Sequence, residues 1–384
     1  MIGKYLMLRP GNAGSVMEEW KQCLNQLVDR RGKGDRLIKL NVFIDTESYD
    51  SFLETSSAIN KQVLQSFGSE FPACAVTVHP PEKPWKVVVE AGYADSASSE
   101  IVSKMWKTIP YVVCNSASGK EIWASGLGTG RNQSDTRKAA ESAFEQLKEV
   151  LDAENMTFDN IVRQWNYIGN ILGLKDGFQN YQVFNEVRSE YYNKYRKVHG
   201  YPAATGIGMK LGGVIIDFCA VQAIDGTAII PVDNPNQVNA YEYGQNVLKG
   251  MPCGGKAAKH PPQFERALLL NRKPKSSLFI SGTASIIGQE TIGIDDVEQQ
   301  TNVTIENISK LADKKRFGGE FSENGHKWGD YSVVRVYIRN QDDFGSVKDL
   351  CNQKFPGATQ VFIESDICRD DLLVEIEAEF LINN

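Results

Sequence analysis

One structural plan is written three times along this chain: a strand, an amphipathic helix, a strand that opens on small residues, and a final strand. The first strand of each copy is expected at residues 37–45, 161–169 and 332–340. Another amphipathic helix precedes each of these strands, and the second and third copies also carry a hairpin ahead of that helix. Because repeated units bury their apolar faces against one another, the repeat constrains the fold more than any single motif does.

Strands that alternate with helices in this way predict an α/β (α+β) fold, with open mixed sheets that carry helices on one face. Three such sheets can cover one another, so we expect an internal pseudo-trimer with a barrel-like centre and clefts at the seams between repeats. The predicted domains are residues 1–95, a repeat truncated by loss of the hairpin, then 96–225 and 226–384. The stretch 224–262 is too long for a mere linker and carries tyrosines, so we expect it to lie across a cleft.

The composition excludes several classes of protein. A net charge of -6 is spread along 384 residues without basic blocks, so we expect no nucleic-acid partner. The cysteines number 7 and lack a CxxC pair, which favours reduced cytoplasmic thiols over a disulfide framework or a zinc site. No apolar run approaches the length of a membrane span. We therefore expect a cytoplasmic protein with no membrane partner, no metal and no cofactor.

The stretch ESDICRDDLLVEIEAEF, residues 364–380, has the period of a strand. Its apolar side chains alternate with Glu375, Glu377 and Glu379, so one face needs a core and the other is acidic. An acidic face is usually a solvated surface, but it can also be one wall of a cleft in which a carboxyl group works. We assign Glu377 and Glu379 to solvent, and the residues alone leave the role of Glu375 open.

Two known families resemble this sequence at different levels of detail. The repeat plan, with its xPAxT and VEIEA motifs, resembles the reactive intermediate deaminase (YjgF-like) fold, which forms trimers with active sites between subunits. The last two thirds of the chain are similar, more specifically, to the chorismatase family. That likeness rests on FISGTASIIGQET, RVYIR, DICRDDLLVEIE, NPNQVNAYEYG, PPQFERALLL, QWNYIGNI and YQVFNEVR.

The resemblance to chorismatases implies an enzyme that releases pyruvate from chorismate, a dianion with an enolpyruvyl ether. It implies that Glu375 is the catalytic acid, a role that needs a carboxyl group still protonated near neutral pH. The resemblance also places Arg188, Arg266 and Tyr241 at substrate-binding positions. The expected partner is therefore a small anionic metabolite, bound by a monomeric pseudo-trimer or a low-order homo-oligomer.

Two further positions bear on the product. Cys368 and Gly282 correspond to positions at which chorismatases that form hydroxybenzoates differ from those that hydrolyse chorismate to a dihydrocyclohexadiene diol. Cysteine together with glycine resembles the hydroxybenzoate-forming branch. We therefore expect a hydroxybenzoate as product, with Cys368 among the catalytic residues and Gly282 in the substrate pocket.

The sequence also departs from the family pattern. Asn236 stands where the family motif has arginine, and Gln289 where it has histidine. These departures keep open a second hypothesis, a protein of the same fold that binds a small metabolite without turnover. A third, an imine or enamine deaminase, is disfavoured, because the arginine that follows the PA motif in such enzymes is replaced by Cys74, Ala204 and Thr359.

Overall fold

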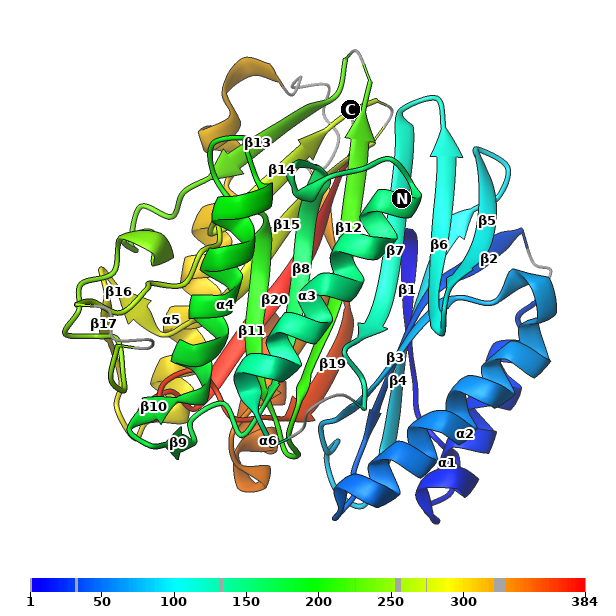
Figure 1. Cartoon of the computed structure of the whole chain (residues 1–384), viewed down its shortest axis with the longest axis horizontal. Helices are drawn as coiled ribbons and strands as arrows, with labels where there is room; N and C mark the ends of the chain where they lie inside the picture. Colours follow the sequence, from blue (N-terminus) through cyan, green and yellow to red (C-terminus); the bar gives the residue numbers. More distant parts are fainter. Residues whose placement is uncertain are drawn as a thin grey trace.

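Three sheets, one for each copy of the sequence repeat, make up most of the molecule in a computed structural model (Figure 1). Helices lie on their outer faces. The structure describes residues 2–31, 34–130, 134–224, 226–252, 257–273, 275–320 and 329–383. The predicted α+β class is confirmed.

The first sheet is the smallest, with strand order β1-β4-β2-β3. Only β2 and β3 run parallel; the other neighbours are antiparallel. It has no counterpart of the hairpins in the other two sheets, in line with the truncated first repeat. Its strands are β1 (Ile2–Leu8), β2 (Asp35–Ile44), β3 (Ala73–Val78) and β4 (Val87–Asp95).

The second and third sheets share one topology. Their strand orders are β11-β8-β12-β7-β6-β5 and β13-β14-β15-β20-β18-β19, so reading one of them backwards aligns β11 with β19 and β12 with β20. The second sheet contains β5 (Ser99–Trp106), β6 (Ile109–Ser116), β7 (Gly119–Leu127), β8 (Ile161–Gly169), β11 (Ala203–Met209) and β12 (Val214–Ala223). The third contains β13 (Ala228–Val232), β14 (Ala267–Asn271), β15 (Lys275–Ala284), β18 (Gly329–Ile338), β19 (Thr359–Glu364) and β20 (Val374–Asn383).

Each sheet carries two α-helices on one face, and their caps explain where several begin. Ser15 forms a capping box with Glu18 ahead of the first helix, while Asp135 and Asp296 cap the third and fifth. The helices are α1 (Val16–Val28), α2 (Tyr49–Phe67), α3 (Thr136–Ala153), α4 (Asn180–Tyr195), α5 (Val297–Leu311) and α6 (Phe344–Lys354). Short strand pairs β9 (Leu174–Lys175) with β10 (Phe178–Gln179) and β16 (Ile286–Ile287) with β17 (Glu290–Thr291) complete the elements, with 3-10 turns at Gly68–Glu70, Phe158–Asn160, Ala240–Glu242, Lys314–Glu320 and Gln341–Asp343.

The sheets meet at three equivalent seams. The edge strand β3 lies beside β7, β11 beside β15, and β19 beside β1. Isolated bridges such as Ala203 with Glu265 and Pro81 with Ile363 join neighbouring sheets, but the described strands do not form one closed barrel. The barrel-like centre is instead a packed interior, in which Phe43, Trp165 and Tyr337 of the three sheets belong to one buried cluster.

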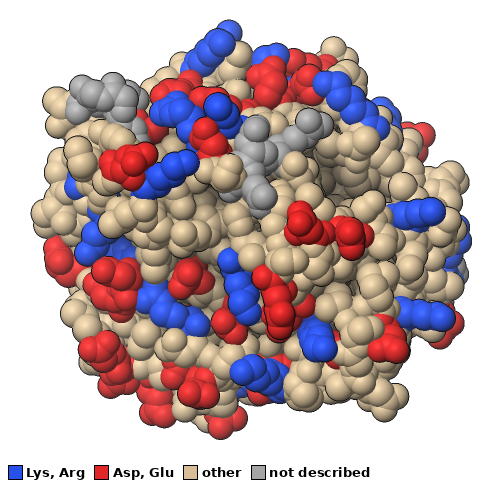
Figure 2. Space-filling model, turned by 60° about the horizontal axis from the view of Figure 1, so that its bottom comes forward, with Lys and Arg blue, Asp and Glu red and all other residues tan. Residues whose placement is uncertain are grey.

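The visible surface is mixed in charge. Figure 2 shows lysine and arginine interspersed with aspartate and glutamate over the whole face in view. Within the described residues, no helix combines the length and the apolar character that a membrane crossing requires.

Candidate active site

A pocket lies at the seam between the second and third sheets, where β11 runs beside β15. Side chains of α4, β11, β15 and β20 form its walls. Tyr243, residues 247–249, Pro262 and Phe264 cover it, and all but Phe264 lie in the long segment 224–262. Only about 50 Å³ of it is open to water, so its own side chains nearly fill it.

Glu375 projects from β20 into this pocket. Alternation along the strand turns Val374 and Ile376 into the helix-side core and Glu375 to the opposite face, where it is 4% exposed. Burial, and after it the neighbouring carboxylate of Glu377, raises the pKa of Glu375 to about 8, although Arg163 and Arg266 act in the opposite direction. A carboxyl group that keeps its proton at neutral pH can serve as a general acid.

Gly282 on β15 provides the space for that carboxyl group. A Cβ atom at this position would lie 2.0 Å from Glu375 Oε1. The ladder between β15 and β20 is irregular between Ile280 and Thr283, as at a β-bulge, a feature common beside active sites. The amide of Gly282 donates to Thr205 Oγ1 across the seam at 3.1 Å. Glycine at 282 is therefore required by the acid beside it.

Two buried guanidinium groups border the same pocket. Arg266 is 3% exposed and donates to the hydroxyl of Tyr243 at 2.7 Å and to the carbonyl of Val238. Arg369 is 8% exposed and donates to the carbonyl of Gln289 at 2.8 Å. Their Cζ atoms lie 5.4 and 5.1 Å from the centroid of the Tyr243 ring. Two fixed cations around one ring can hold the carboxylates of an anionic ligand.

Cys368 lies in the wall of the pocket and is partly buried. Burial, followed by the proximity of Glu375, raises the pKa of its thiol to about 12. The group is therefore a neutral thiol at physiological pH, suited to shaping the pocket and to weak hydrogen bonding rather than to nucleophilic attack.

Arg188 is close to the pocket without lining it. Its side chain is 1% exposed, stacks 5.3 Å from the centroid of Phe184, and donates from Nη2 to Asn185 Oδ1 at 2.7 Å. Asn185 does line the pocket, and its amide nitrogen has no hydrogen-bond partner among the described residues. Arg188 thus orients an amide donor toward the pocket.

The structure places Tyr241 outside the pocket lining. Its hydroxyl donates to Glu265 Oε2 at 3.4 Å, and its ring packs 5.3 Å from that of Tyr201. Tyr243, two residues later in the same AYEY motif, lines the pocket instead. The resemblance assigned Tyr241 to the substrate, and the directions of the two tyrosines are set by a 3-10 turn at Ala240–Glu242.

Asn185 and Arg369 also line the pocket, although the resemblance assigned neither of them to the substrate. Arg369 follows Cys368 directly in the DICR motif, and Asn185 lies in the FNEVR motif with Arg188. In both cases, the sequence signal that could have found the residue was its place in a motif that already contained a candidate site residue.

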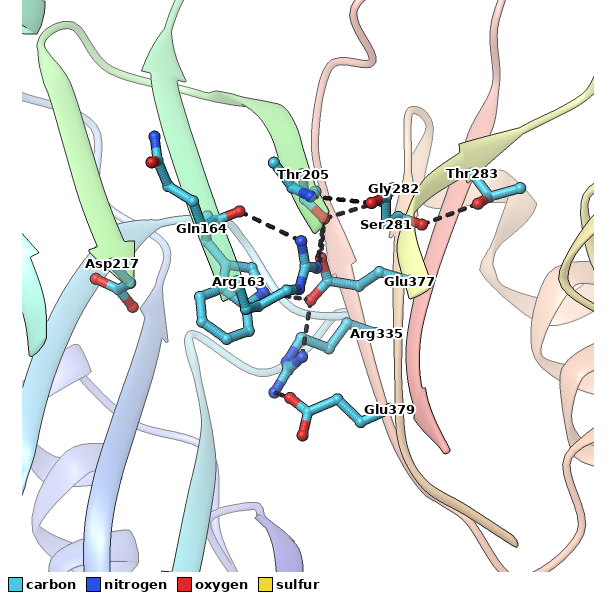
Figure 3. Close-up of polar contacts among 12 residues, drawn as sticks. Arg163, Gln164, Thr205, Asp217, Ser281, Gly282, Thr283, Arg335, Glu377 and Glu379 are labelled. Atoms are coloured by element: carbon cyan, nitrogen blue, oxygen red, sulfur yellow. Dashed lines mark hydrogen bonds and ion pairs between the residues drawn. The ribbon is translucent and has the colours of Figure 1, made fainter. Parts of the chain in front are cut away.

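The prediction that Glu377 and Glu379 face solvent is wrong. They are 0% and 3% exposed, because the face of β20 opposite its helices looks into the centre between the sheets rather than outward. Glu377 accepts from Arg163 Nη2 at 2.6 Å, from Arg335 Nη1 at 2.8 Å, from Trp165 Nε1 at 2.7 Å, and from the hydroxyl of Thr205 (Figure 3).

Ion pairs run in a ring between the three sheets, which we call the central ion-pair ring. Arg163 of the second sheet pairs with Glu377 of the third, and Arg335 of the third pairs with Glu90 of the first, 2.8 Å from Nη2 to Oε1. Lys39 of the first sheet closes the ring with Asp217 of the second at 3.6 Å. All six side chains are buried, and each takes part in an ion pair with a neighbouring sheet.

The two departures from the family pattern lie around the pocket rather than in its lining. Asn236 bonds to Asn234 and Asn307. Gln289 accepts from the amide of Gly244 at 3.1 Å, next to Tyr243, and its carbonyl holds Arg369. Gln289 thus holds both the cover, through Gly244, and the guanidinium group of Arg369. In the described part of the chain, no group of three or more His, Cys, Asp or Glu side chains is placed to hold a metal ion.

Known proteins resemble this chain both in sequence and in three-dimensional structure. A sequence model described as "Chorismatase FkbO/Hyg5-like, N-terminal" matches residues 103–220. A 3-hydroxybenzoate synthase of Streptomyces hygroscopicus is 32% identical over 256 residues, which cover 65% of this chain and 70% of the relative. A chorismatase of Streptomyces rapamycinicus is 32% identical over 226 residues, 57% of this chain and 64% of the relative, so the chain spans somewhat under two thirds of that protein.

The fold of this chain is also similar to that in a crystal structure of a chorismatase. It superimposes with a TM-score of 0.67 over 99% of both chains at 21% sequence identity. The arrangement of three sheets with outer helices is therefore shared with a protein of known structure.

Proposed function

This chain belongs to the chorismatase family, and from that premise we propose that it releases pyruvate from chorismate and forms a hydroxybenzoate. The 3-hydroxybenzoate synthase and chorismatase relatives support this substrate and this class of product. The proposed acid is Glu375, and the proposed anchors are Arg266 and Arg369 with the amide of Asn185.

The chemistry begins with a proton. The enolpyruvyl ether of chorismate has an electron-rich methylene carbon, and protonating it turns the ether into an oxocarbenium ion. Glu375, whose carboxyl group has a pKa of about 8, is proposed to donate that proton. The bond between the ether oxygen and the ring then breaks, and pyruvate leaves with the oxygen as its carbonyl.

The fate of the ring fixes the product. If no water adds, the ring loses one proton and becomes aromatic, and chorismate minus pyruvate has the composition of a hydroxybenzoic acid. That proton restores Glu375, so the cycle consumes no acid. If water adds, the product is a dihydrocyclohexadiene diol. A pocket with about 50 Å³ open to water supports the first outcome, as does the neutral thiol of Cys368 in its wall.

Substrate entry requires a movement. A space of about 50 Å³ holds only a few water molecules, far less than a substituted ring with two carboxylates. The part of the cover formed by Tyr243 and residues 247–249 has to move outward, and its return over the bound substrate would exclude water from the ring.

One observation carries the proposal: a protonated, buried carboxyl group shares a pocket with two guanidinium groups. Deamination receives no such support, because Ala204 lines this pocket where the deaminases carry their arginine. A binding protein without turnover would also use the guanidinium groups, but it has no need of the acid.

The test is a pyruvate assay. Purified protein is incubated with chorismate, pyruvate is followed with a coupled enzyme, and the aromatic product is identified by chromatography. We expect Glu375→Gln to lower the rate by roughly a thousandfold, within the range for loss of a general acid. Release no faster than in Glu375→Gln would contradict the proposal. Thermal stabilisation by chorismate without product would favour the binding protein instead.

A further inference from the structure

Burial, and after it the carboxylate of Glu377, raises the pKa of Glu375. The two residues are two positions apart on β20 and face the same side of the sheet, so their side chains lie next to each other. Like charges at this separation cannot both be accommodated cheaply in a buried site. One of the two acids must therefore hold its proton.

The surroundings decide which one. Burial alone would raise the pKa of Glu377, but Arg163 and Arg335, with the hydrogen bonds from Thr205 and Trp165, lower it. Its two oxygens accept four donors, so the ionised form is satisfied. Glu375 has none of these donors, and the described structure gives its carboxyl group no hydrogen bond to a cation. The negative charge accordingly resides on Glu377.

A mechanical link accompanies the electrostatic one. Arg163 Nη2 donates to both Glu377 Oε2, at 2.6 Å, and Thr205 Oγ1, at 2.7 Å, and the Thr205 hydroxyl itself donates to Glu377 (Figure 3). The Thr205 oxygen accepts the amide of Gly282 at 3.1 Å. Since Gly282 is the surface against which the Glu375 carboxyl rests, Glu377 holds the backbone that positions the acid.

From these contacts we propose that Glu377 is a positioning residue: it keeps the proton on Glu375 by placing a fixed negative charge beside it, and it fixes Gly282 through Thr205. This inference deepens the proposed function and rests on it. Glu377 pairs with Arg335 across the β18–β20 ladder. The equivalent positions in the other two sheets also carry acids: Glu90, which pairs with Asn41 in the first sheet, and Asp217, which pairs with Trp165 in the second. Only in the third sheet do further acids stand two residues away, Glu375 on one side and Glu379 on the other.

Other charged or titratable groups also surround Glu375. Arg163 from β8 and Arg266 ahead of β14 oppose protonation, while Arg369, Cys368 and Tyr181 line the same pocket. Removing the negative charge of Glu377 would leave Arg163 and Arg335 without that partner, and their positive charge would favour ionised Glu375 as well. Both effects lower the pKa of Glu375.

The experiment compares Glu377→Gln with Glu379→Gln, a change of the same kind at a buried acid on the same strand that bonds to Tyr5 rather than to Thr205. Turnover of chorismate is measured against pH. In the parent protein kcat/KM is expected to fall as the pH rises through about 8. In Glu377→Gln this fall should move to lower pH by roughly one unit, and in Glu379→Gln it should stay in place.

A second measurement does not need turnover. The carboxyl carbon of Glu375 is followed by NMR in protein labelled with ¹³C-glutamate, with Glu375→Gln in each background as the assignment control. The midpoint should move down in Glu377→Gln only. If the parent releases no pyruvate but the midpoint moves, the proposed function fails and the positioning role stands. An unchanged midpoint in folded Glu377→Gln overturns the positioning role.

Thr205→Val covers the case in which Glu377→Gln does not fold. This variant keeps every charge and removes the link to Gly282, so kcat should fall roughly tenfold while the alkaline limit of the pH profile stays near that of the parent. If kcat is unchanged, the mechanical part of the proposal is wrong.

Discussion

Two seams of this molecule share one geometry but differ in chemistry. Where β3 meets β7, a cleft with about 720 Å³ open to water lies between the first and second sheets; where β11 meets β15, the pocket has about 50 Å³. Cys74 and Gly126 line the first at the register positions that Ala204 and Gly282 occupy in the second. The fold therefore builds the cleft at both seams, and the side chains decide what it can do.

The two decisive side chains are absent from the first seam. Register pairs Ile215 with Tyr167 as it pairs Glu375 with Tyr337, so β12 carries isoleucine where β20 carries the acid. On the hairpin strands, Pro110 stands where the second seam has Arg266. The first seam therefore lacks both the carboxyl group and the guanidinium group at these positions.

The covers differ as well. The chain passes from β5 to β6 through residues 107 and 108, whereas the equivalent connection in the third sheet, between β13 and β14, is a long segment that supplies the cover of the second pocket. Of these two seams, only the second is covered by a long segment, the one between β13 and β14, and this segment closes the cleft into a pocket. Acid, cation and cover thus occur together.

After loss of the acid itself, the largest expected effect follows from removing the cation that distinguishes the seams. Arg266→Met should lower kcat/KM for chorismate by roughly a hundredfold, mainly through KM, since it takes away a buried partner of a substrate carboxylate. The matched control is Lys61→Met, which removes a cation that lines the first cleft and should change kcat/KM less than about twofold. Equal losses in the two variants would contradict the assignment of function to the second seam.

A smaller effect concerns stability. Because the folded-state pKa of Glu375 is raised to about 8, its contribution to folding is fully present below the ordinary pKa of glutamate and is lost as the pH rises through about 8. Glu375→Gln removes this dependence. Chemical denaturation at about pH 5 and about pH 8 should show the parent losing on the order of 2 kcal/mol more than the variant. Parallel losses would mean that the acid is ionised in the folded protein.

The smallest effects are expected for alanine substitutions at the two equivalent glycines, Gly282 and Gly126. Gly282→Ala should lower kcat roughly tenfold with little change in melting temperature, because the new methyl group displaces the carboxyl group of Glu375. Gly126→Ala should leave kcat within about twofold but cost about 1–2 kcal/mol, since Gly126 has a φ of +78° and a Cβ there would lie 2.9 Å from the carbonyl oxygen of Cys74. Kinetics together with thermal unfolding distinguishes the two, and a reversed pattern would refute the comparison.

Much of this architecture was predictable from the sequence, because strand and helix periodicities are local. The strand predicted at residues 161–169 is β8, and the alternation at 364–380 gave the correct apolar face of β20. The opposite face was misjudged. A period of two says which side chains share a face, but not that three sheets will bury that face between them, so Glu377 and Glu379 were assigned to solvent.

The site was accessible to the sequence only through resemblance to a family. Glu375, Arg266, Gly282 and Cys368 all line one pocket, although nearly a hundred residues separate Gly282 from Glu375. Choosing Tyr243 over Tyr241 depends on the direction of a single turn, which no pattern in the sequence specifies.

The central ion-pair ring has one more consequence. Arg335 also pairs with Glu377 of its own sheet, but a fragment carrying only residues 226–384 would lose Glu90 as a partner of Arg335 and Arg163 as a partner of Glu377. The strand with the acid could not be excised as a working module. The proposed active site therefore depends on more than one repeat, because both the second and the third sheets line its pocket.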